Sequence, residues 1–161
     1  MIEDPATLLR MLFETAIGAA NPAPCVPPHL PPPTAGRTVV VGAGKAAAAM
    51  ARAVEGHYQG AVCGAVVVPY GHGASCKNIR VIEAAHPVPD AAAAEAAQIM
   101  LDAVDGLVTE DLVIALMSGG GSALLAQPVL GLPLADKQAV THALLASGAA
   151  IGEINAVRRA L

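Results

Sequence analysis

The stretch VVVGAGKAAAAM, Val39 to Met50, joins three β-branched residues, two glycines, a lysine and a run of alanines. Consecutive valines are typical of a strand buried on both faces of a parallel sheet, and the alanines from Ala46 onward favour a helix. Gly42 and Gly44 predict a tight turn between the two. A helix that begins there directs backbone N–H groups and its positive dipole end toward the turn. We therefore expect an anion above the turn, with Lys45 beside it.

The composition predicts a core of small aliphatic side chains. Hydrophobic residues make up 55% of the 161 residues and aromatic residues only 2%, which suits a parallel sheet covered by helices. The formal net charge is −4 and no basic cluster occurs, which argues against a nucleic-acid partner.

Targeting signals are also missing from the pattern. The first residues, MIEDPATLL, are acidic and lack the order of a signal peptide, and glycines and prolines interrupt the uncharged run Leu112–Ala135. Three cysteines without close paired spacing favour reduced thiols. We expect a cytoplasmic protein with no membrane partner.

Hydrophobic periodicity predicts the order of elements. Pro5–Ala20 is expected to be an amphipathic helix, and residues 21–33 a stiff proline-rich connector without helix or central strand. Strand-like runs then alternate with helix-like runs. The expected strands are Thr38–Val41, Ala65–Val68, Ile79–Ala84 and Leu112–Met117, and the expected helices are Ala46–Glu55, Ala91–Val104, Asp136–Ala146 and Glu153–Leu161. This order predicts one α/β domain over residues 1–161, with a Rossmann-like, doubly wound, mainly parallel sheet and helices on both faces.

The loops GAGK, PYGHG, HPVPD and SGGGS follow the four expected strands and should meet at one edge of the sheet, where ligands bind. In the last loop Gly119, Gly120 and Gly121 can form a nest of backbone N–H groups that binds phosphate, with hydroxyl donors from Ser118 and Ser122. A helix or turn beginning at Ala123 would direct its dipole at the same anion. A flexible tight turn is the alternative.

Two nucleotide motifs nearly match the first glycine turn. The dinucleotide fingerprint fits from Gly42 to Ala47, but it needs an acid at the end of the next strand, and no Asp or Glu occurs between Glu55 and Glu83. A Walker loop fails because Val39 and Ala46 stand where a glycine and a metal-binding hydroxyl belong. A lysine that simply faces solvent remains an alternative for Lys45.

The two remaining segments contain candidate substrate contacts. His86 precedes a proline, so it should be extended; it could bind substrate or satisfy backbone groups, while Asp90 is expected to cap the next helix. In EINAVRRAL, Asn155 and Arg159 share a helix face, and an amphipathic helix with solvated arginines is the alternative reading.

With GAGKAA, YGHG, HPVPD, SGGGSALL and EINAVRRAL in this order, the chain resembles the bacterial and archaeal glycerate 2-kinase family, some members of which are named hydroxypyruvate reductases. The resemblance implies a Rossmann-like large domain, a smaller second domain and an active site between them. It also implies transfer of phosphate from ATP to the 2-hydroxyl of D-glycerate with a divalent metal, Mg²⁺.

By this resemblance Lys45 matches the family's active-site lysine, Ser118–Ser122 its glycine loop, and Asn155 and Arg158 its INxVR helix. The family continues beyond this helix, so the chain is expected to be the N-terminal portion of a two-domain kinase that needs the second domain for activity. No Mg²⁺ ligands or general base can be assigned. A homodimer, an NAD(P)-dependent hydroxypyruvate reductase and a non-catalytic α/β module remain open.

Overall fold

The sheet has four strands, and all of them are parallel. A computed structural model describes residues 4–119 and 121–161. Its strands are β1 (Thr38–Gly44), β2 (Cys63–Pro69), β3 (Ile79–Ala84) and β4 (Leu112–Ser118), in the spatial order β3-β2-β1-β4. The chain therefore winds outward from β1 to β3 and then returns to the other side of β1, as the sequence predicts for a doubly wound sheet.

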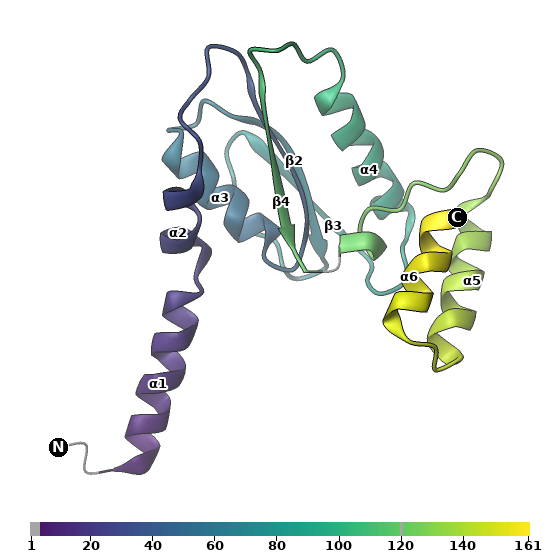
Figure 1. Cartoon of the computed structure of the whole chain (residues 1–161), viewed down its shortest axis with the longest axis horizontal. Helices are drawn as coiled ribbons and strands as arrows, with labels where there is room; N and C mark the ends of the chain where they lie inside the picture. The colour runs from purple at the N-terminus through teal and green to yellow at the C-terminus, as the bar shows by residue number, and fades with distance from the viewer. Residues whose placement is uncertain (1–3, 120) are drawn as a thin grey trace.

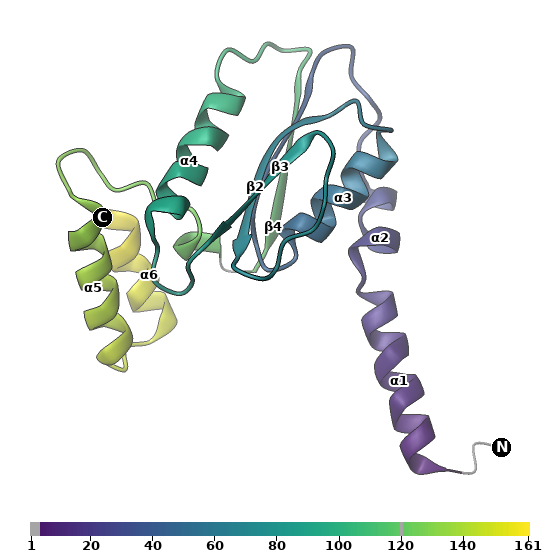
Figure 2. The same cartoon turned by 180° about the vertical axis from the view of Figure 1, so that it is seen from behind.

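Helices cover both faces of this sheet (Figures 1 and 2). One face packs against α3 (Ala47–His57) and the other against α4 (Ala91–Val104). Successive valines divide between the two cores, since Val66 belongs to the cluster with α3 and Val67 to the cluster with α4. This period of two is the reason that an uninterrupted valine run is required in a central strand.

The first glycine turn lies later in the chain than the sequence predicts. Gly42 and Gly44 both belong to β1, and the turn to α3 falls at Lys45 and Ala46. Gly44 has φ +123°, and a Cβ there would collide with the carbonyl and hydroxyl of Ser118 on β4. Glycine is thus needed for a close approach of two strands rather than for the turn itself.

The N-terminal region partly differs from expectation. Helix α1 (Pro5–Ala19) is confirmed, but none of its residues is buried, and it projects away from the sheet (Figures 1 and 2). The prediction that residues 21–33 contain no helix is wrong: α2 (Pro22–Cys25) and the 3₁₀ helix η1 (Pro27–His29) lie there. Both begin with proline in the first turn, where its missing N–H is not required.

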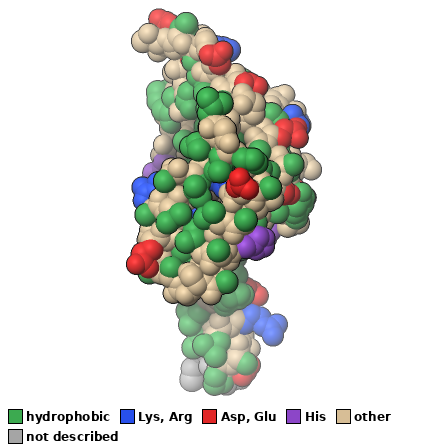
Figure 3. Space-filling model, turned by 90° about the vertical axis from the view of Figure 1, so that its right-hand side faces the viewer, with side chains coloured by type: hydrophobic (Ala, Val, Ile, Leu, Met, Phe, Trp, Pro, Cys, Tyr) green, Lys and Arg blue, Asp and Glu red, His purple; other side chains and the backbone are tan. Residues whose placement is uncertain are grey.

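The chain ends in two helices, α5 (Leu134–Ala146) and α6 (Ile151–Ala160), which pack against each other beyond the carboxyl edge of the sheet (Figure 1). Their side of the molecule exposes mainly hydrophobic and uncharged side chains, with separate charged groups (Figure 3). No helix in the described part of the chain is both long and apolar enough to cross a membrane.

A buried carboxylate fixes the segment that leads into β3. Glu55 on α3 accepts backbone hydrogen bonds from Lys77 (2.7 Å), Asn78 (2.6 Å) and Ile79 (3.2 Å). Burial alone would raise the pKa of Glu55, but these three donors together outweigh it and leave the pKa below its usual value. The carboxylate therefore holds the loop more strongly in its charged form than when it is protonated.

Replacing Glu55 by Gln should lower the free energy of unfolding at neutral pH by about 1–3 kcal/mol, because the amide directs its own N–H₂ group toward backbone donors. The folded-state pKa is lowered, so the contribution of Glu55 is complete above its unfolded pKa and is lost as the pH falls through the folded value. Urea unfolding between neutral and acidic pH should show the difference between wild type and variant shrinking below the unfolded pKa. Glu95→Gln, which alters an exposed ion pair with Arg80, is the control and should change little.

Candidate functional site

The carboxyl ends of β1 and β4 lie side by side where the sheet changes winding direction. Gly44 pairs with Ser118 in the register of the two strands. The Ser118 hydroxyl accepts a 2.8 Å hydrogen bond from the Ala46 N–H at the start of α3, a helix whose own N-cap residue provides no side-chain acceptor. In open α/β sheets ligands bind at this switch point.

The glycine loop begins directly at this point. Gly119 has φ +58°, and the 3₁₀ helix η2 occupies Gly121–Ala123, two residues earlier than the turn that the sequence predicts. Gly120 lies outside the described residues. A Cβ on Gly121 would come within 2.8 Å of the Ala43 Cβ, so the loop folds back closely over the end of β1.

A pocket of about 470 Å³ lies between this loop and the α5–α6 hairpin. It brings together four of the predicted site residues, Gly121, Ser122, Asn155 and Arg158. Its described lining is completed by Leu125, Gln127, Val129, Lys137, Arg159 and Leu161, and none of these side chains is acidic. We call this hollow the basic pocket.

Other predicted residues lie outside the basic pocket. Lys45 is exposed in the turn before α3, and the His86 side chain is exposed after β3. Gly44 is buried against Ser118, and Gly42 lines a different hollow. The His86–Pro87 peptide bond is cis.

The segment after β3 fixes the hairpin through its backbone. The Arg158 guanidinium donates to the Pro87 carbonyl (2.9 Å), and the Gln138 side-chain amide donates to the Pro89 carbonyl (2.8 Å). Residues of α6 and α5 are thus tied to the HPVPD loop at the same edge of the sheet as the glycine loop. These bonds fix the hairpin, which forms one wall of the basic pocket, to the carboxyl edge of the sheet.

Two basic residues of this pocket were not singled out as ligand contacts by the sequence, Lys137 and Arg159. Lys137 is only 7% exposed, and its ammonium makes one hydrogen bond to described residues, 3.5 Å from the Arg158 carbonyl. Burial, and secondarily the Arg158 charge, lower the pKa of Lys137, and burial lowers the pKa of Arg158. In the sequence Lys137 lies in LADKQAV, which is indistinguishable from the solvated face of a helix.

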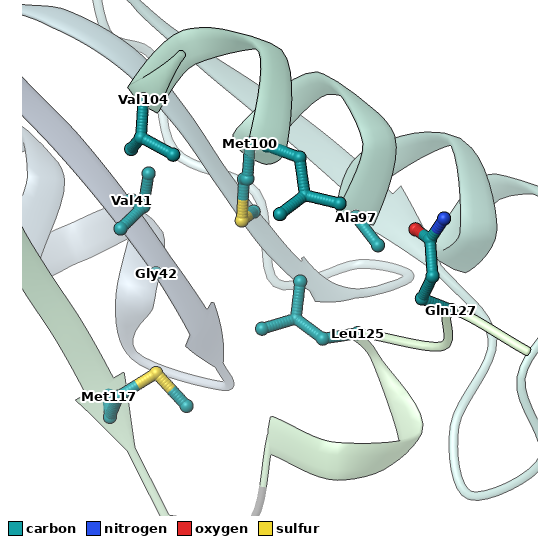
Figure 4. A pocket seen from close by; sticks show the side chains of 9 residues that line it. Val41, Gly42, Ala97, Met100, Val104, Met117, Leu125 and Gln127 are labelled. Atoms are coloured by element: carbon teal, nitrogen blue, oxygen red, sulfur yellow. The ribbon is translucent and has the colours of Figure 1, made fainter. Parts of the chain in front are cut away.

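An apolar hollow of about 320 Å³ adjoins the basic pocket. Figure 4 shows Ala97, Met100 and Val104 of α4 facing Val41 and Gly42 of β1, with Met117 and Leu125 on the other side. Leu125 and Gln127 line both hollows. An apolar space and a cationic space therefore lie on either side of one short segment.

Asp90 is occupied by structural contacts. As the sequence predicts, it caps α4, since its Oδ1 accepts from the Ala93 N–H at 3.0 Å, and its Oδ2 accepts from the Tyr70 hydroxyl at 2.8 Å. Tyr70 follows directly after β2, at the position where a dinucleotide enzyme places an acid for the ribose. Among the described residues no cluster of three or more His, Cys, Asp or Glu could hold a metal ion.

Comparison with known proteins identifies the family. Residues 8–161 match the family described as a domain of unknown function, DUF4147. The chain belongs to the DUF4147 family. Its relatives include a "D-glycerate 2-kinase" of Thermotoga maritima, 39% identical over 98% of this chain and 39% of that protein. They also include a protein of Agrobacterium vitis named "Putative hydroxypyruvate reductase", 49% identical over 96% of this chain and 35% of that protein.

A similar protein of known structure has the same fold. The crystal structure of Thermotoga maritima glycerate kinase superposes with a TM-score of 0.81 at 38% identity, covering 96% of this chain and 38% of that one. The resemblance to glycerate kinases and the doubly wound fold are thereby confirmed. The chain spans little more than a third of the length of each of these relatives.

The two serines of the glycine loop should differ in their effect on stability. Ser118→Ala removes the acceptor for the Ala46 N–H and should lower the free energy of unfolding by about 1 kcal/mol. Ser122 is exposed and makes no side-chain hydrogen bond to described residues, so Ser122→Ala should leave stability unchanged and serves as the matched control. Urea unfolding followed by circular dichroism measures both. Equal effects of the two substitutions would contradict the capping role of Ser118.

Proposed function

We propose that this chain is the nucleotide- and phosphate-binding portion of a D-glycerate 2-kinase, which transfers a phosphoryl group from ATP to the 2-hydroxyl of D-glycerate. The supporting observation is the basic pocket. Its one wall is the glycine loop at the β1–β4 switch point, and its other wall carries Asn155 and Arg158. Both substrates of such a kinase are anions, and the described lining of this pocket has cations and no acids.

The chemistry of phosphoryl transfer suits these residues. That reaction asks the protein mainly to position the phosphates and stabilise charge. The backbone N–H groups and hydroxyls of Ser118–Ser122 would hold phosphate oxygens, and Asn155 and Arg158 would orient glycerate. Lys45 would neutralise charge that develops during transfer. Mg²⁺ supplies charge neutralisation to kinases, but the described residues offer it no ligand cluster, so the proposal assigns it none.

A nicotinamide-dependent reductase is the second candidate, because of the name carried by the Agrobacterium relative. The residues argue against it here. No acid follows β2, and both carboxylate oxygens of Asp90 already accept hydrogen bonds from Ala93 and Tyr70. The position directly after β2, where a dinucleotide enzyme binds the ribose through an acid, is therefore held by Tyr70.

The remaining parts of the proposal concern the whole protein. A second domain would complete the active-site cleft over the glycine loop, and the protein would act in the cytoplasm. A homodimer is compatible with the exposed apolar residues of α1, such as Leu9 and Phe13. These statements depend on the kinase proposal, and a result that contradicts the kinase function also removes their support.

Mg-ATP should bind this chain more tightly than NADH. The glycine loop provides donors for phosphates, whereas the ribose acid of a dinucleotide enzyme is missing after β2. Isothermal titration calorimetry with each ligand measures the two dissociation constants directly. Tighter binding of NADH would favour the reductase, and no detectable binding of either ligand would favour a domain whose cleft is incomplete without the second domain.

Lys45→Met should abolish most kinase activity without destabilising the fold. Lys45 is exposed just before α3, where a cation opposes the positive end of the helix dipole at a cost of about 0.3–1 kcal/mol. We therefore expect an unchanged or slightly raised melting temperature, and a loss of phosphoryl transfer to D-glycerate on the order of a hundredfold. The assay uses the longest protein that contains this segment. Lys77→Met, at an exposed lysine near the amino edge of the sheet, is the control; near-normal turnover of Lys45→Met would remove Lys45 from the site.

A further inference from the structure

We propose that the basic pocket is a binding site for a small oxyanion, a phosphate or carboxylate group, and that Lys137 and Arg159 bind this group together with Arg158. The glycine-loop motif and the INxVR motif assign neither Lys137 nor Arg159. The inference builds on the kinase function, because both substrates of that reaction carry such a group, but it is a statement about binding and is tested separately.

The position of Lys137 is the main observation. The residue as a whole is only 7% exposed, and its partly buried ammonium lines the basic pocket, where a cation normally has a carboxylate partner or several strong acceptors. Within the described residues, Lys137 has one carbonyl acceptor at 3.5 Å, and neither Lys137 nor Arg158 nor Arg159 forms an ion pair. An anion in the pocket would supply the missing counter-charge.

The cations come from different elements that converge on one hollow. Lys137 lies on α5, whereas Arg158 and Arg159 lie on α6, and Ser122 faces them from η2. Arg158 uses its Nη2 for the Pro87 carbonyl, and Arg159 donates its Nε to the Asn155 carbonyl at 3.4 Å. Other N–H groups of both guanidiniums stay available for oxygen ligands in the planar arrangement that suits carboxylate and phosphate.

The size and charge of the pocket fit this class of ligand. A volume of about 470 Å³ lies within the usual range for small-molecule sites, and the glycine loop forms its rim. Burial and repulsion by Arg158 lower the pKa of Lys137, and the negative charge of a bound anion would oppose this shift. The negative charge of the ligand would therefore stabilise the charged forms of the basic side chains that the α5–α6 hairpin places in the pocket.

A purely structural role for Lys137 is the competing explanation. Its ammonium contacts a carbonyl in the last turn of α6, where a cation is favourable with respect to the helix dipole. That role predicts a stability loss on substitution but no dependence on added anions. The two explanations therefore differ in anion binding.

The experiment titrates the 161-residue chain with inorganic phosphate and, separately, with D-glycerate, following backbone amide chemical shifts by NMR. We expect saturable shifts at Ser122, Asn155 and residues around Lys137 with at least one of the anions. Lys137→Met should weaken this binding by about tenfold or more, and Arg159→Gln should weaken it several-fold, because each removes a cation from the site. Lys77→Met is the matched control and should bind as the wild type does.

Competition between the anions distinguishes their sources. Binding of phosphate alone indicates a phosphoryl subsite, binding of D-glycerate alone a carboxylate subsite, and mutual displacement a shared one; each supports the proposal. Absence of saturable shifts with both anions, or unchanged binding in Lys137→Met and Arg159→Gln, would overturn it. If Lys137→Met does not fold, Lys137→Arg, which keeps the charge, should retain binding, while the exposed Arg159→Gln should still weaken it several-fold. If the protein binds one of these anions but no nucleotide, the anion site is retained and the kinase proposal is rejected. If it binds nucleotide but neither anion, the kinase proposal is retained and the anion site is rejected.

Discussion

The hydrogen bond from the Ala46 N–H to the Ser118 hydroxyl joins the three elements on which the site depends. It connects the start of α3 to the end of β4, across the carboxyl end of β1. Gly44 makes this contact sterically possible, because a Cβ at its φ of +123° would collide with Ser118. With the strand ends held this close, the chain after Ser118 must leave the sheet directly above β1. The glycine loop therefore lies over the switch point, where an open α/β sheet binds its ligands.

The second requirement for the site is that the α5–α6 hairpin lies next to this loop. The hairpin contributes no strand and packs mainly on itself, so its position depends on a few polar bonds. Arg158 and Gln138 donate to backbone carbonyls of the HPVPD loop, and the Val129 N–H donates to the Leu161 carbonyl at 2.8 Å. These bonds direct three cations toward the glycine loop. Partial burial of the Lys137 ammonium without a carboxylate partner among described residues has a free-energy cost, which the proposed anion would offset.

The two candidate functions, a kinase and a nicotinamide-dependent reductase, require different residues at the end of β2. A dinucleotide enzyme needs a free carboxylate there, whereas a kinase needs none. Tyr70 stands at this position, and its hydroxyl is bonded to Asp90, which also caps α4. Among the described residues, no acid stands directly after β2, the position at which a dinucleotide enzyme requires one.

The sequence by itself determined most of the secondary structure and the class of fold. Strand Ile79–Ala84 and helix Ala91–Val104 were predicted to the residue, since valine runs, alanine-rich segments and the Asp90 cap are local signals. Local signals failed at Gly42, because the sequence does not distinguish a glycine in a turn from a glycine that lies close to a neighbouring strand. They failed again at Pro22–His29, where proline begins a helix instead of preventing it. Only the tertiary structure showed that Lys137, an ordinary helix lysine in the sequence, is buried beside Arg158, and that Lys45 and His86 lie outside the basic pocket. The reason is physical: burial and the meeting of charges from separate helices depend on packing between distant segments, and residue type and spacing do not encode that packing locally.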